Sequence, residues 1–237
     1  MNTILKMLYR PVQAFRELKN SGKFAWMSLI VLLIVLLIDN ILKIPVMARV
    51  LELTMASVSG QMSDEQFDAS MQILHKMRYL SAIISVFSHL VYLIFYTLVI
   101  WILAMIVKPS ISFLKALEMM IHCYFILAMG MLADTFILYY QGIENINNIL
   151  ELSLTGLNVF TSVESVGAMM YTFLMLISPF YVWFVVIMTI GLAVLAGMKY
   201  QKAFIISFIF WMLLIVYTVV TVYFSQVIMQ KAGFDFI

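Results

Sequence analysis

The chain has 237 residues, of which 65% are hydrophobic and only 11% are charged, and its mean hydropathy is +1.06. A soluble domain has about 25% charged and about 45–50% apolar residues, so this composition excludes a water-soluble globular fold. The formal net charge of +2 gives no electrostatic basis for binding nucleic acid. The single cysteine, Cys123, excludes an internal disulfide and a cysteine-based metal cluster.

Several apolar stretches exceed the roughly 18–20 residues that are needed to cross the hydrocarbon core of a bilayer. They predict an all-α polytopic membrane protein, with five transmembrane helices in a single bundle surrounded by lipid. We expect Pro45 to close the first span and Pro179 to loosen the fourth. The predicted spans cover about residues 24–42, 80–107, 113–139, 168–196 and 203–228.

The domain organisation that we predict is a cytoplasmic amphipathic segment, 1–23, followed by one five-helix domain, 24–237. The distribution of Lys and Arg favours a cytoplasmic N-terminus, because most of them fall in the N-terminal segment and in two short turns. The outer loops are longer. In two outer segments, 63–77 and 145–160, the apolar residues follow a spacing that predicts amphipathic helices.

The N-terminal segment mixes apolar and basic residues and is expected to break at Pro11. This pattern is typical of a helix that lies at the membrane interface, with its cations near anionic headgroups. We favour this role of membrane anchor over docking of a cytoplasmic partner. The cations that we expect to make these lipid or docking contacts are Lys6, Arg10, Arg16, Lys19 and Lys23.

Ionisable residues inside a span are costly and often functional, and the third predicted span contains the pair Glu118 and His122. They are four residues apart and share one face of the helix, with Lys115 in reach of Glu118. With His89 of the second span they suggest a metal site, but a zinc ion needs three or four protein ligands. We favour a polar cluster that ties spans two and three together, and a proton relay is the second interpretation.

The second predicted span carries a stripe of polar side chains that share a face by helical spacing: Ser85, His89, Tyr92 and Tyr96. In lipid such residues join helices through hydrogen bonds of modest net strength. Packing between helices is therefore the preferred interpretation, and a substrate groove is the sharper alternative. The predicted intramembrane polar cluster consists of Ser85, His89, Tyr92, Glu118 and His122.

Enzymatic activity is not indicated by any motif. The sequence contains no HExxH, GxSxG or Walker A pattern, and no loop is long enough for a soluble catalytic domain. We therefore predict a protein that is not an enzyme and has no cofactor and no metal.

Two stretches resemble the Yip1 domain of bacterial membrane proteins. The first, LYRPVQAFRELKNSGKFAW, places a Pro, an aromatic residue and a Trp in the family's order, at Pro11, Phe15 and Trp26. The second, SPFYVWFVVIMTIGLAVLAGMKYQKAF, covers 178–204. Its residues that match the family pattern are Phe180, Trp183, Ile190, Gly191, Lys202 and Ala203.

The resemblance implies a small non-enzymatic protein of the bacterial inner membrane that crosses it several times. Bacterial members look like accessory or assembly partners of other integral membrane complexes, including ABC-type exporters. The alternative function is a small carrier or channel that moves protons, ions or a small solute between spans two and three. Whether the protein forms a homo-oligomer stays open.

Overall fold

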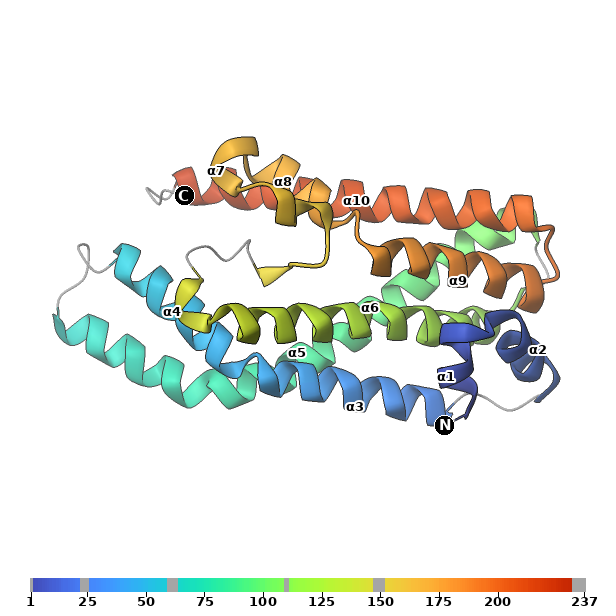
Figure 1. Ribbon diagram of the computed structural model, residues 1–237, viewed down its shortest axis with the longest axis horizontal. Coiled ribbons are helices and arrows are strands. Elements are labelled where there is room, and N and C mark those ends of the chain that lie inside the picture. The colour runs from blue at the N-terminus through green and yellow to red at the C-terminus, as the bar shows by residue number, and fades with distance from the viewer. Residues whose placement is uncertain (1, 22–25, 59–63, 109–110, 147–151, 232–237) are drawn as a thin grey trace.

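The computed structural model (Figure 1) describes residues 2–21, 26–58, 64–108, 111–146 and 152–231. Within these ranges the chain forms helices and no β-strand, which confirms the predicted all-α class. The long helices run along the long axis of the molecule, and α6 (Phe113–Gln141) lies in their middle. The helix α1 and the last turns of α10 lie at opposite ends of the bundle.

Three helices contain stretches that are long and apolar enough to cross a membrane: α5 (Asp64–Val107), α6 and α10 (Tyr200–Lys231). Two bent pairs of helices meet the same test, and the number of spans is five if each pair crosses once. The helix predicted for 63–77 leads directly into the second span, as expected, and the two form α5, one helix of 44 residues.

The first bent pair joins α3 (Trp26–Leu42) to α4 (Ile44–Val58) at an angle of 45°. The helix α3 ends at Leu42, where the first span was predicted to end, and Pro45 is the second residue of the next helix, α4. Proline is tolerated in the first turn of a helix, where its missing N–H would have no partner within the helix. Pro45 therefore lies just after the point at which the chain changes direction between α3 and α4.

The second bent pair consists of α8 (Ala168–Met175) and α9 (Pro179–Leu195), which meet at 51°. Pro179 separates two helices here and does not merely loosen one span as expected. Ser178 caps the new helix, since its Oγ accepts a hydrogen bond of 3.2 Å from the backbone N–H of Tyr181.

The hydrophobic core is centred on α6, which packs against α3, α5 and α9. Its residues from Met119 to Ala128 are all buried, so this stretch of the helix is enclosed by protein on every side. Gly191 allows α9 to approach closely, because a Cβ at this position would lie 2.5 Å from Met119 Cγ and 2.9 Å from Phe15 Cζ. Small residues commonly permit such close packing in membrane bundles.

The N-terminal segment forms α1 (Asn2–Tyr9) and α2 (Pro11–Ser21), which meet at Pro11 as expected. The apolar face of α2 packs against the protein. Ala14 and Phe15 are fully buried, and α2 packs against α9. The segment therefore covers one end of the bundle (Figure 1).

The opposite end of the bundle contains the segment that was predicted to be the second outer loop. Its described residues form short 3₁₀ turns, η2 (Ile143–Asn145) and η4 (Leu157–Phe160), followed by α7 (Val163–Val166). The amphipathic helix predicted for 145–160 is therefore wrong for these residues, while 147–151 lie outside the described residues. Gly156 explains part of the irregular path, because a Cβ there would lie 2.4 Å from the backbone oxygen of Met175.

Candidate functional site

His122 lies at the centre of a buried polar contact between α3 and α6. Its Nδ1 is 2.7 Å from the backbone oxygen of Glu118, and its Nε2 is 3.0 Å from Oγ of Ser28 on α3. Because a carbonyl oxygen only accepts, Nδ1 is the donor, and in the neutral ring Nε2 accepts from the Ser28 hydroxyl. Phe15 of α2 covers the ring edge-on, with 6.1 Å between the ring centroids.

Glu118 lies one turn before His122, and its side chain is buried, with 3% exposed. Its Oε2 accepts a hydrogen bond of 2.7 Å from Nζ of Lys115, whose side chain is 32% exposed. The expected pairing of these two residues is therefore present. The lysine brings a compensating charge from the surface to a carboxylate that would be costly to bury alone.

His89 of α5 bonds to a different residue of α6. Its Nδ1 is 2.8 Å from the hydroxyl of Tyr124, and the two ring centroids are 6.1 Å apart. Tyr96 packs beside Tyr124 and edge-on against Phe210 of α10. This aromatic group joins α5, α6 and α10 around a single hydrogen bond.

The five residues of the predicted polar cluster are thus divided between different helix pairs. His122 contacts α3, whereas His89 contacts Tyr124. Tyr92 is 42% exposed and packs near Tyr96, and Ser85 is half-buried on the same helix. Within the described part of the chain neither Ser85 nor Tyr92 bonds to His122. The stripe on α5 is therefore not continuous with the Glu118–His122 turn.

A second set of polar contacts lies in the half of the bundle that is farther from α1 and α2. Asp39 of α3, which is 1% exposed, accepts a hydrogen bond of 2.6 Å from the Thr135 hydroxyl of α6. Its second oxygen accepts a hydrogen bond of 2.8 Å from Nζ of Lys43, which lies four residues further along the chain. Asp134 of α6 accepts from the backbone N–H of Leu154 at 2.7 Å. These carboxylates hold α3 and the chain at Leu154 against α6.

The partners Ser28, Thr135 and Tyr124 were missed by the sequence analysis. For Ser28 a signal existed, because it stands on one face of α3 with the buried residues Leu32, Leu36 and Asp39 at spacings of four, four and three. For Tyr124 the helical spacing gives no comparable signal, since every residue of α6 from Met119 to Ala128 is buried.

The predicted basic contacts of the N-terminal segment differ from one another. Lys6 forms an ion pair of 2.7 Å with Glu17 and so joins α1 to α2. This hydrogen bond with Lys6 lowers the pKa of Glu17 below its usual value. Arg10, Arg16 and Lys19 are exposed, and the Arg10 guanidinium lies 6.0 Å from the Tyr9 ring centroid. Lys23 lies outside the described residues.

Metal binding is not indicated by the geometry. In the described ranges no three His, Cys, Asp or Glu side chains lie close enough to hold an ion. Cys123 is fully buried. The histidines and carboxylates named above are all hydrogen-bonded to other residues of the protein. Several of these bonds join two helices, so the polar groups stabilise the packing of the bundle.

The family of this chain follows from its comparison with models of known protein families. The family model of the Yip1 domain matches residues 5–221, which extend from α1 through most of α10. The chain belongs to the Yip1 domain family. The Yip1 domain is a membrane-protein family and not an enzyme family, so the helices of this Yip1 protein are embedded in a lipid bilayer. Searches of curated proteins and of solved structures return no match.

Proposed function

We propose that this Yip1 protein is a non-enzymatic accessory or assembly partner of another integral membrane complex of the bacterial inner membrane, such as an ABC-type exporter. The observation that carries the proposal is the contrast in burial between the spanning helices. In the most apolar stretch of α6, 67% of the residues are buried, against 22% in α5 and 33% in α10. Two helices thus present most of their surface outward.

The outward faces of α5 and α10 support contact with a membrane partner. They carry large apolar side chains, among them Phe87 with 66% exposed and Ile94 with 56% exposed on α5. Between helices in lipid the main attraction is close packing, because lipid tails are as apolar as the side chains. A partner helix that fits such a surface replaces lipid there without breaking any contact inside the bundle.

The polar side chains in the bundle support the same proposal, because they are paired with one another. His122 bonds to Ser28, His89 to Tyr124 and Asp39 to Thr135. A carrier would need such groups along a path that water or a solute reaches, so this pairing disfavours the alternative of a carrier or channel. Reconstituted proteoliposomes test that alternative directly, since sustained proton, ion or solute flux would establish it.

Affinity purification from native membranes in lipid nanodiscs tests the proposal. We expect a second membrane protein in stoichiometric amount. Phe87→Cys labelled with a photoreactive maleimide is expected to crosslink to this protein. The unsubstituted chain is the matched control, because its single thiol, Cys123, is fully buried and escapes labelling. Recovery of the chain alone, or only of copies of itself, would overturn the proposal.

A further inference from the structure

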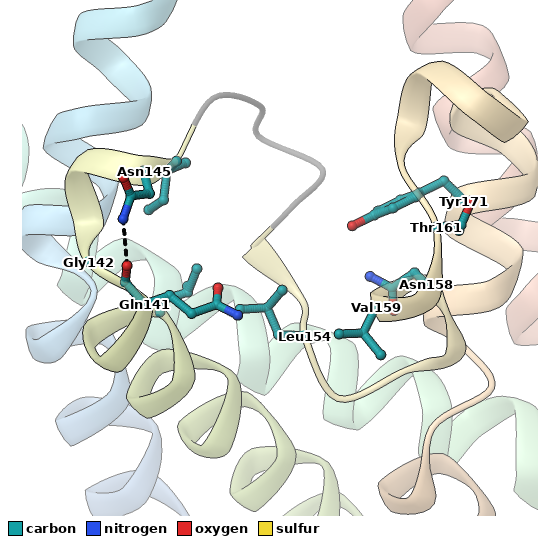
Figure 2. Close-up of a pocket in the computed structure, with 10 residues that line it drawn as sticks. Gln141, Gly142, Asn145, Leu154, Asn158, Val159, Thr161 and Tyr171 are labelled. Atoms are coloured by element: carbon teal, nitrogen blue, oxygen red, sulfur yellow. Dashed lines mark hydrogen bonds between the residues drawn. The ribbon is translucent and has the colours of Figure 1, made fainter.

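A cavity of about 210 Å³ lies at the end of the bundle opposite α1 and α2. Its walls come from the end of α6, from the turns η2 and η4 and from the start of α8, and Figure 2 shows these segments around it. Ligand pockets commonly have volumes of about 300–1,000 Å³, so this cavity is small and suits a group no larger than one amino-acid residue.

The polar part of the lining consists of neutral groups. Three side-chain amides, those of Gln141, Asn145 and Asn158, line the cavity together with the hydroxyls of Thr161 and Tyr171. Figure 2 shows the Tyr171 hydroxyl directed toward the space between η2 and η4. All the described lining residues are uncharged. A charged ligand would lose its hydration here without gaining an opposite charge.

Asn158 is the lining residue with unused hydrogen-bonding capacity. It is fully buried, and its Nδ2 donates a hydrogen bond of 2.6 Å to the backbone oxygen of Ser153. Its Oδ1 has no hydrogen-bond partner in the described part of the chain. Buried polar atoms are rarely left unpaired, so this oxygen calls for an N–H or O–H donor.

The rest of the lining is apolar and includes Leu138, Ile146 and Leu154. An acyl chain would satisfy these side chains but would leave Oδ1 of Asn158 without a hydrogen-bond partner. A peptide or carboxamide group supplies both a donor and an acceptor, as the lining amides do. An apolar group attached to it would occupy the remaining surface.

We propose that this cavity binds a neutral ligand that carries a peptide or carboxamide group beside a small apolar side chain. The site is separate from the exposed faces of α5 and α10, and its occupation does not depend on a membrane partner. The proposed ligand site can therefore be confirmed or refuted independently of the proposed accessory role.

Saturation-transfer NMR of the full chain in lipid nanodiscs, with N-acetyl-leucine amide as the probe, tests the proposal. Empty nanodiscs measure partition of the probe into lipid. We expect saturable binding above that background, and about tenfold weaker binding of the charged N-acetyl-leucine and of glucose, equal to about 1.4 kcal/mol.

Two substitutions on η4 form a matched pair. Val159, 49% exposed, lines the cavity, whereas Leu157, 44% exposed, does not. Val159→Trp is expected to abolish binding of the probe, and Leu157→Trp to leave it unchanged. Gln141→Ala, at an exposed position, removes one amide without filling the cavity and should weaken binding by up to about tenfold. No saturable signal, equal binding by both tryptophan variants, or equally tight binding of glucose would overturn the proposal.

Discussion

The two ends of the bundle are built differently. At the end that carries α1 and α2, the side chain of Phe15 is fully buried over His122, and Gly191 brings α9 into contact with it. At the other end the last turn of α6, the turns η2 and η4 and the start of α8 surround a cavity whose lining includes three side-chain amides. The comparison suggests that the first end provides stability and that the second provides recognition.

The largest effect that separates the two ends is expected from Phe15→Ala. Removal of a fully buried phenylalanine side chain costs about 3–5 kcal/mol, because the cavity that remains collapses only partly. Thermal unfolding in nanodiscs should show a clear decrease in the unfolding temperature. Arg16→Ala, at the exposed neighbouring position, is the control and should change it little. Equal stability of both variants would show that α2 is not part of the core.

The carboxylate near the cavity end is expected to give the next largest effect. Asp39→Asn removes a charge that is bonded to both Thr135 and Lys43, and hydrogen bonds to charged groups contribute about 1.5–3 kcal/mol. Glu52→Gln is the matched control, because Glu52 is half exposed and its atoms lie 3.6 Å from Arg49. For such a surface pair we expect about 0–1 kcal/mol. Chemical unfolding of both variants measures the difference.

The hydrogen bond between Ser28 and His122 is expected to contribute about 1 kcal/mol, as a neutral bond between helices does. A double-mutant cycle of Ser28→Ala and His122→Ala isolates this interaction. Ser88→Ala is the control, since the Ser88 hydroxyl donates to a backbone oxygen of its own helix, that of Ile84. Additive effects of the two single substitutions would contradict the contact.

The smallest effect concerns the exposed ion pair between α1 and α2. Because the pKa of Glu17 is lowered in the folded state, the pair adds stability that is complete above the ordinary value of 4.5. This contribution disappears as the pH falls through the lower folded-state pKa. The unfolding temperature of the wild type should thus fall toward that of Glu17→Gln as the pH is lowered from 6 toward 3. Parallel curves for the two proteins would exclude the linkage.

Much of the fold follows from the sequence, because the length and apolar character of α5, α6 and α10 are local properties. The Lys115–Glu118 pair is likewise local, since the two residues are one turn apart. The position of α2 is not local. An amphipathic helix has the same pattern whether its apolar face meets lipid or protein, so the burial of Phe15 could not be read from the spacing.

The change in chain direction at the two prolines also could not be predicted from the sequence. Pro45 and Pro179 each stand in the first turn of a helix, and a proline there has the same local pattern as one that follows a helix end. The pairing of His122 with Ser28 depends on which faces of α3 and α6 meet. These residues are 94 positions apart, and helical spacing relates only residues on one helix.

The accessory role is tested most directly by native mass spectrometry of the protein ejected from nanodiscs that were prepared from its own membrane. We expect one dominant assembly that contains this chain and a different membrane protein in a fixed ratio. A spectrum with only the chain of 27.3 kDa, or only multiples of that mass, would contradict the account.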